Sequence, residues 1–318
     1  MTDPSGASAP AQASPAGSVR PALSPARLAM RRFRRNRLAL AGLVILALVL
    51  SASAAGLVWD RIAAWSGEDQ PYREQLPGIH PQPPSLVPFH PFGTDPLGRN
   101  MLARTLLGGC VSLGVGLAAA LVSVAVGTVW GTVAGYLGRG TDTLMMRIVD
   151  VLYGLPYILL VILLLVLFEE RSVGMRMAAL FLAIGGVSWL TMARVVRGQV
   201  LAIRETEFVH AARAIGAGPG RIIFREVLPN LAGTILVCAT LTVPLAILQE
   251  SFLSFLGLGV PPPLASWGTL ASDALGALNP VQTYWWLMAF PCALLGATLL
   301  GLNFVGDGLR DAFDPRAQ

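Results

Sequence analysis

Few residues of this sequence have the types and the spacing that chemistry requires. Its three histidines and three cysteines are His80, His90, His210, Cys110, Cys238 and Cys292. The histidines are scattered, and the cysteines lie inside apolar blocks with neither a CxxC pair nor the Cys/His spacing of a metal site. We therefore expect the cysteines to be small packing residues, and we expect no metal site.

The sequence contains no lysine, because all 23 residues of its combined lysine and arginine count are arginine. Without lysine the chain cannot hold ATP phosphates through a P-loop, form a Schiff base or build a kinase-type site. If ATP powers this protein, another chain must hydrolyse it. We expect no cofactor and no catalytic residue in this chain.

One short motif raises the alternative of an enzyme. The stretch Gly186-Val187-Ser188-Trp189 matches the GxSx pattern of a rhomboid-like intramembrane serine protease. That chemistry needs a histidine base within the membrane, and all three histidines fall outside the apolar blocks. Neither HExxH nor GxSxG occurs. The motif therefore gives little support to an enzyme.

Two carboxylates lie at the ends of apolar blocks, where an ionisable group is costly and tends to face a cavity. Glu250 is expected at the outer end of the fifth block. It either lines a pathway and could meet an amino group, or snorkels to the outer interface. Asp150 is expected near the inner end of the third block, paired with Arg147.

The elements that must position these residues are long apolar blocks. Of the 318 residues, 54% are hydrophobic and only 13% are charged, which argues against a water-soluble enzyme. Six blocks can span the roughly 30 Å hydrocarbon core of a bilayer: residues 38–59, 106–134, 151–168, 177–193, 231–248 and 285–305. We expect an all-α polytopic membrane protein with six transmembrane helices. The first block also resembles a signal peptide, but its length favours a retained span.

The arginines indicate the orientation of these spans. With six spans both termini lie on one side, and that side carries 17 arginines against 6 on the other. The positive-inside rule then places both termini and the loop 194–230 in the cytoplasm. The formal charge of +5 therefore indicates membrane orientation and contact with anionic headgroups rather than binding of nucleic acid.

The chain divides into three regions. Residues 1–30 should form a disordered cytoplasmic tail, since most of them are Ala, Ser, Pro and Gly. Residues 31–104 hold the first transmembrane helix and a Pro-rich extracytoplasmic loop. Residues 105–318 form a core of five helices that includes the cytoplasmic loop 205–230.

Glycines and prolines in the core predict how its helices pack. The spacing Gly127-x3-Gly131-x3-Gly135 leaves one side of the second span smooth, so another helix can approach closely. Pro156 and Pro244 remove backbone hydrogen bonds from the third and fifth spans and should kink them.

The loop 205–230 carries an amphipathic pattern. Apolar side chains recur at i, i+3, i+4 and i+7 in Phe208, Ala211, Ala212 and Ile215, which predicts one face of a short helix. The glycines from Gly216 to Gly220 should end it, and Arg221 to Val227 can form a second short helix. Such a loop either docks into a groove of a partner protein or lies on the lipid headgroups.

Four motifs of this sequence carry a family resemblance. Ala211-Ala212-x3-Gly216-x9-Glu226-x-Leu228-Pro229 resembles the EAA loop of binding-protein-dependent ABC importer permeases. Three further stretches narrow the likeness to DppC/OppC-like permeases of dipeptide, oligopeptide and nickel importers. They are His90-Pro-Phe-Gly-Thr-Asp-Pro-Leu-Gly-Arg99, Glu250-Ser-Phe-Leu-Ser-Phe-Leu-Gly-Leu-Gly259 with Pro262 and Ser266-Trp267-Gly268, and Gly306-Asp-Gly-Leu-Arg-Asp311 with Asp314-Pro315.

The likeness covers nearly everything after residue 30, with three departures. His210 stands where the general EAA pattern has glutamate, Glu226 where it has an aliphatic residue, and Asn100 where the outer motif usually has aspartate.

The resemblance implies a type I ABC importer permease fold, in which the EAA loop is a coupling helix that contacts an ATPase subunit. It makes one set of residues candidates for that contact: Glu207, Ala211, Ala212, Gly216, Leu228 and Pro229. A second set are candidates for a pathway or gate: Glu250, Asp95, Arg99 and Trp267.

The resemblance also implies partners. These are a homologous permease, two ABC ATPase subunits that bind ATP and magnesium, and an extracytoplasmic substrate-binding protein, all at a bacterial cytoplasmic membrane. The implied substrate is a di- or oligopeptide, with nickel as the alternative. A secondary transporter is the rival class; it would use an ion gradient without a soluble ATPase and would leave the EAA loop unexplained.

Overall fold

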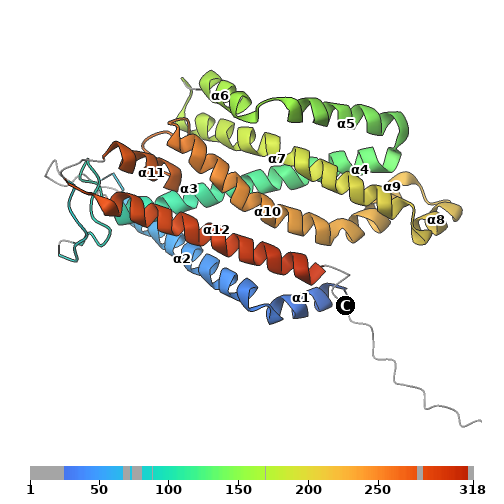
Figure 1. The fold of residues 1–318 in the computed structure, drawn as a ribbon, viewed down its shortest axis with the longest axis horizontal. Helices are drawn as coiled ribbons and strands as arrows, with labels where there is room; N and C mark the ends of the chain where they lie inside the picture. Colours follow the sequence, from blue (N-terminus) through green and yellow to red (C-terminus); the bar gives the residue numbers. More distant parts are fainter. Residues whose placement is uncertain are drawn as a thin grey trace, which may run out of the picture.

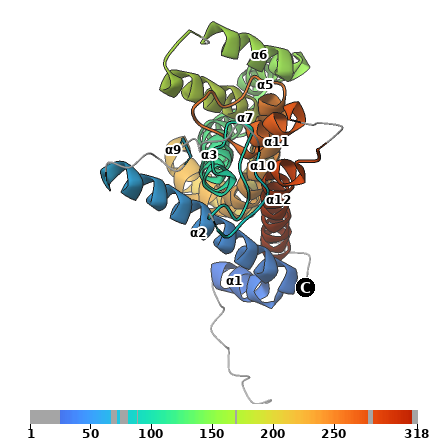
Figure 2. The ribbon, with the colours of Figure 1, turned by 90° about the vertical axis from the view of Figure 1, so that its left-hand side faces the viewer.

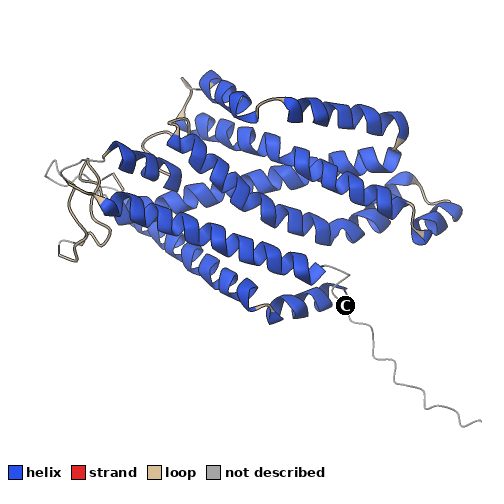
Figure 3. Cartoon of the chain, viewed as in Figure 1, coloured by secondary structure: helices blue, strands red, loops and turns tan. Residues whose placement is uncertain are grey.

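The computed structural model describes residues 25–66, 72–73, 81–87, 89–168, 170–277 and 282–313, with side chains from residue 28 onward. Helices dominate these residues (Figures 1 and 3), and pairing between extended segments there is confined to two isolated bridges, Ser85–His90 and Thr94–Asn100. The fold is therefore all-α, as the apolar blocks predict. Residues 1–24 of the expected tail and the Asp314-Pro315 pair lie outside the described residues.

Five helical stretches are long and apolar enough to cross a membrane. They are α2 (Arg37–Ser66), the continuous run of α3 (Met101–Val122), η1 (Ser123–Gly127) and α4 (Thr128–Leu137), α7 (Val173–Arg204), the run of α9 (Pro219–Ile222), η2 (Ile223–Val227) and α10 (Leu228–Phe255), and α12 (Trp285–Phe313). Each contains one of the predicted blocks, so five of the six spans are found as single helices.

The remaining span is broken. The sequence predicts one helix over 151–168, but α5 (Arg139–Gly154) and α6 (Tyr157–Leu167) meet at an angle of 81°. The break lies at Leu155, whose backbone is extended, and Pro156. Proline has no N–H and disfavours the helical conformation of the residue before it, so a helix tends to end there. Pro244, in contrast, is buried inside an unbroken α10.

The helices form a bundle with two distinct edges. The helix α2 packs along α12 and α3, α10 packs along α3, and α4 packs along α7. Figure 2 shows α1 and α2 at one edge of the bundle and α5 with α6 at the opposite edge. Figure 1 shows α8 (Glu207–Ala214) at one end and α11 (Trp267–Gly276) at the other. We refer to these ends as the α8 end and the α11 end.

The glycine spacing of the second span is used for close packing, as predicted. A Cβ atom on Gly131 would lie 2.5 Å from the carbonyl oxygen of Ala193, and Gly127 and Gly135 face Met192 and Val200 in the same way. Because even one methyl group would collide, these glycines allow α4 to lie directly against the backbone of α7.

A further helix, α1 (Pro25–Arg35), begins inside the range 1–30 expected to be a disordered tail. It packs against α12. Asn36 separates α1 from α2, and its side-chain oxygen accepts hydrogen bonds from the backbone N–H groups of Leu38 and Ala39 at 3.0 and 3.2 Å. Residues 25–30, which were expected to belong to the disordered tail, are therefore helical.

Candidate functional site

The loop between α7 and α10 contains the predicted short helix. The helix α8 follows Thr206 and is succeeded by Gly216, whose φ of +82° places it in the left-handed region. Glycine adopts this region without the steric cost that a Cβ atom brings. The prediction that the glycines from Gly216 onward end this helix is confirmed.

This loop presents apolar side chains to its surroundings. Only Val209 of α8 is fully buried, whereas Phe208, Ile215 and Phe224 are 43%, 82% and 73% exposed. Of the candidate coupling residues, Glu207, Ala211, Gly216 and Pro229 are exposed, and Ala212 and Leu228 are half-buried. An exposed apolar cluster of this kind marks either a protein contact or a lipid contact.

The second half of the loop differs from the prediction of a separate short helix. The turns α9 and η2 run without a break into α10, so that residues 219–255 form one helix. Pro219 stands in the first turn, where its missing N–H costs nothing. At 1.5 Å per residue these 37 residues span about 55 Å. A single rigid element therefore joins the α8 loop to the α11 end.

Buried charges lie at the α11 end. The Asp95 carboxylate, only 2% exposed, accepts hydrogen bonds from Nε of Arg99 at 2.6 Å and from Nη1 of Arg104 at 2.5 Å. It also accepts the backbone N–H groups of Leu97 and Arg99. Arg104 is 5% exposed and donates its other terminal nitrogen to Asp273 at 3.3 Å. Asp95 therefore neutralises a buried arginine and fixes the turn that precedes α3.

A further carboxylate, Glu250 of α10, is fully buried. Its two oxygens accept hydrogen bonds from the hydroxyl groups of Ser254 at 2.6 Å and Ser112 at 3.1 Å. The backbone N–H of Trp267, in the first turn of α11, donates to Ser112 at 3.2 Å. These contacts join α3, α10 and α11.

Burial excludes one of the two alternatives that the sequence leaves open for Glu250. Glu250 and Trp267 are each 0% exposed. Glu250 therefore does not snorkel to an interface, because serine hydroxyl groups enclose it inside the bundle. A place for Glu250 or Trp267 in a pathway stays a prediction. Asp95 and Arg99, however, border an open hollow of about 470 Å³ at the α11 end, together with Asp273 and Tyr284.

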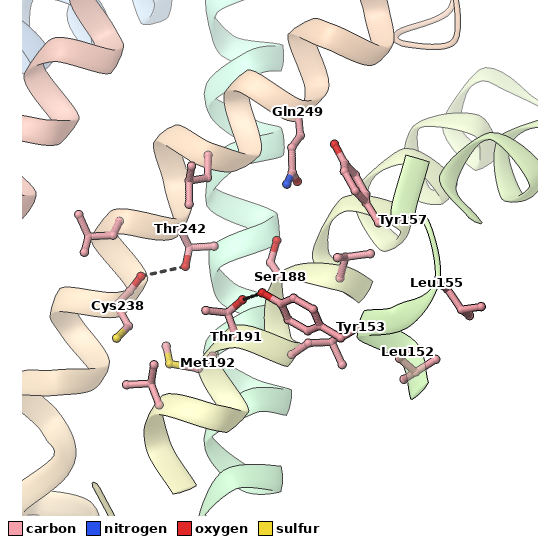
Figure 4. Close-up of a pocket in the computed structure, with 15 residues that line it drawn as sticks. Leu152, Tyr153, Leu155, Tyr157, Ser188, Thr191, Met192, Cys238, Thr242 and Gln249 are labelled. Carbon is pink, nitrogen blue, oxygen red and sulfur yellow. Dashed lines mark hydrogen bonds between the residues drawn. The ribbon is translucent and has the colours of Figure 1, made fainter. Parts of the chain in front are cut away.

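A cavity of about 570 Å³ lies between the end of α5, the start of α6, α7 and α10. Figure 4 shows Tyr153, Thr191, Thr242 and Gln249 around it. The hydroxyl groups of Tyr153 and Thr191 are 3.2 Å apart, and Thr242 donates to the carbonyl oxygen of Cys238 at 2.8 Å. Among the described residues, the buried side-chain oxygen of Gln249 has no hydrogen-bond partner. The cavity thus combines an apolar wall with polar groups that can receive a solute.

The polar cavity residues Tyr153, Thr191, Thr242 and Gln249 are not predicted from the sequence, although a signal is present. Cys238, Thr242 and Gln249 recur at i, i+4 and i+11, which is one face of a helix. A polar stripe along an apolar span indicates a surface turned away from lipid.

The pairing predicted for Asp150 is wrong. Its partner is Arg194 of α7, at 2.8 Å, rather than Arg147 one turn away on its own helix. The Arg194 guanidinium also lies over the Tyr153 ring, 4.1 Å from the centroid. A second ion pair, Arg197 with Asp142, joins the same two helices nearer the α8 end. Contacts between helices therefore decide the partners of these charges.

A bundle of membrane-length helices with a partly polar cavity on one side and an exposed helical loop at one end defines a polytopic membrane protein, and this arrangement suits a transport protein. Comparison with known proteins agrees. Residues 127–318 match the binding-protein-dependent transport system inner membrane component. Residues 24–101 match the N-terminal transmembrane domain of oligopeptide transport permease C.

Relatives cover nearly the whole chain. The oligopeptide transport system permease protein OppC of Bacillus subtilis is 43% identical over 91% of this chain and 88% of its own length. The dipeptide transport system permease protein DppC of the same organism is 45% identical over 93% and 88%. OppC of Escherichia coli is 44% identical over 91% and 90%. The chain belongs to the family of binding-protein-dependent transport system inner membrane components, and it is a permease with several membrane-spanning helices.

Proposed function

We propose that this chain is one of two nonidentical permease subunits of an ABC importer, and that it carries di- or oligopeptides across a bacterial cytoplasmic membrane. The observation that carries the proposal is the extent of the likeness: relatives named as oligopeptide and dipeptide permeases align over more than nine-tenths of the chain. The cavity between α5, α6, α7 and α10 supports it, because about 570 Å³ of space lies within the usual range for small-molecule sites.

In this proposal the other subunits supply energy and recognition. Two ABC ATPase subunits bind ATP and magnesium, and an extracytoplasmic binding protein delivers the peptide. The exposed side chains of Phe208, Ile215 and Phe224 are the surface that an ATPase subunit would cover. The backbone turn at Gly216 and the start of the long helix at Leu228 and Pro229 hold this surface in position.

The orientation follows from the same assignment. An ATPase is cytoplasmic, so α8 and both termini are placed in the cytoplasm and α11 outside, in agreement with the arginine count. A reporter that fluoresces only in the cytoplasm should give signal when fused after Gly218, and none when fused after Pro84 or Leu264. Fluorescence from the Pro84 fusion in intact cells would contradict the six-span arrangement.

We also expect that this chain forms the transport pathway while other chains hydrolyse ATP. The purified chain should hydrolyse no ATP, because it has no lysine and no phosphate-binding loop. Reconstituted in proteoliposomes with the second permease, both ATPase subunits and the loaded binding protein, it should support ATP-dependent peptide uptake. Uptake that persists without the ATPase subunits but stops when the proton gradient is collapsed would support a secondary transporter instead.

A further inference from the structure

The exposed ion pair between Asp150 and Arg194 lies next to residues that line the cavity. Asp150 stands three residues before Tyr153 on α5, and Arg194 stands three residues after Thr191 on α7. Tyr153 and Thr191 both line the cavity. Because α5 begins and α7 ends at the α8 end, the pair lies about one turn closer to that end than Tyr153 and Thr191 do, next to Val195 of the cavity lining. In the orientation proposed above, this is the cytoplasmic side of the cavity.

The surroundings of the pair indicate an aqueous space rather than lipid. The side chains of Arg194 and Asp150 are 41% and 65% exposed. Arg194 lies about 15 Å, or ten residues, from the end of α7. Arg194 directly follows the fourth apolar block, and polar side chains continue from the pair along the cavity to Gln249.

The second ion pair between the same helices provides a contrast. Arg197 holds Asp142 through two nitrogens, at 2.5 and 2.6 Å, and Asp142 is only 15% exposed. This bidentate geometry suits a structural link. Arg194 and Asp150 instead meet through one nitrogen and one oxygen. Exposed ion pairs of this kind contribute little to stability and open easily.

We propose that Asp150 and Arg194 form a binding site for the charged termini of a peptide that leaves the cavity toward the cytoplasm. Asp150 takes the peptide's ammonium group and Arg194 takes its carboxylate, and the two residues re-form their own ion pair after the peptide has passed. The Tyr153 ring over Arg194 holds the guanidinium toward the cavity. This inference rests on the proposed function, because it assumes that the cavity is the peptide pathway.

The test uses the complete reconstituted importer and measures peptide uptake and ATP hydrolysis together. The probes are a tripeptide with free termini and its N-acetylated form, selected so that the binding protein binds both equally. Asp150→Asn should lower uptake of the free peptide about tenfold, as expected for loss of a hydrogen bond to a charged group. It should leave uptake of the acetylated peptide unchanged, and the unmodified importer should already transport that peptide about tenfold more slowly.

Arg194→Gln tests the other half of the site independently, with a C-amidated tripeptide as the insensitive probe. Asp142→Asn is the matched control, because it removes the partner of the structural ion pair and should affect free and blocked peptides alike. Asp150→Glu should restore uptake of the free peptide.

Two outcomes would overturn the inference. Equal loss of free and blocked peptide uptake in Asp150→Asn would show that the pair only joins α5 to α7. Uptake unchanged by both Asp150→Asn and Arg194→Gln would show that neither charge meets the peptide. An unmodified importer that transports no peptide would instead refute the proposed function.

Discussion

Replacement of Gly216 by aspartate should prevent recovery of the ATPase subunits with this chain while leaving its helices inserted in the membrane. Gly216 has a φ of +82° and follows α8 directly. A residue with a side chain loses roughly 1 kcal/mol or more in this region. If an ATPase covers the loop, burial of the new, unpaired carboxylate costs several kcal/mol more. Co-purification of the ATPase and peptide uptake should each fall at least about tenfold, since 1.4 kcal/mol corresponds to that factor.

Two control variants separate the causes. Gly216→Asn has a similar backbone cost, because asparagine and aspartate both tolerate the left-handed region, but it adds no charge. It should therefore retain more of the ATPase than Gly216→Asp. Gly198→Asp adds the same charge on α7, where a new Cβ atom would meet no other atom within 4 Å. Normal recovery of the ATPase with Gly216→Asp would refute the coupling-helix assignment. Reduced membrane association of the loop together with normal ATPase recovery would favour contact with headgroups instead.

Replacement of Asp95 by asparagine should destabilise the α11 end of the protein strongly. The carboxylate faces Arg104, and the two side chains are 2% and 5% exposed. The asparagine side chain has nearly the same shape but no charge, so Arg104 would remain a buried cation without its main counter-ion. Loss of one partner of a buried ion pair costs about 3–5 kcal/mol. The midpoint of thermal unfolding in detergent should therefore fall by several degrees, with less folded protein recovered from membranes.

The matched control is Asp273→Asn. Asp273 contacts the same arginine, but at 3.3 Å and with 51% of its side chain exposed, and exposed ion pairs contribute about 1 kcal/mol or less. The midpoint of thermal unfolding should therefore fall much less in Asp273→Asn than in Asp95→Asn. Equal shifts in the two variants would mean that Asp95 does not hold the buried charge. Arg104→Met in the Asp95→Asn background should recover part of the lost thermal stability, because it removes the buried arginine that has lost its counter-ion.

The sequence by itself determined the features that depend on local chain properties. Six apolar blocks predicted the bundle because backbone groups in lipid must form hydrogen bonds within a helix. The spacing from Gly127 to Gly135 predicted close packing, because residues four apart lie on one helix face and glycine has only a hydrogen atom where other residues have a side chain. Gly216 was predictable as a helix end for an equally local reason. Family likeness was likewise visible in four short motifs.

The tertiary structure decided what depends on which helices become neighbours. Sequence proximity suggested Arg147 for Asp150, yet α7 brings Arg194 to it. Glu250 was expected either to line a pathway or to snorkel to the outer interface, and Ser112 of α3 and Ser254 enclose it inside the bundle. The sequence predicted only a kink at Pro156, whereas α5 and α6 meet at 81° and line the cavity on both sides of the bend. Periodicity identifies a helix and its faces, but the free energy of a charge depends on the groups within a few ångströms, and most of those come from distant parts of the chain.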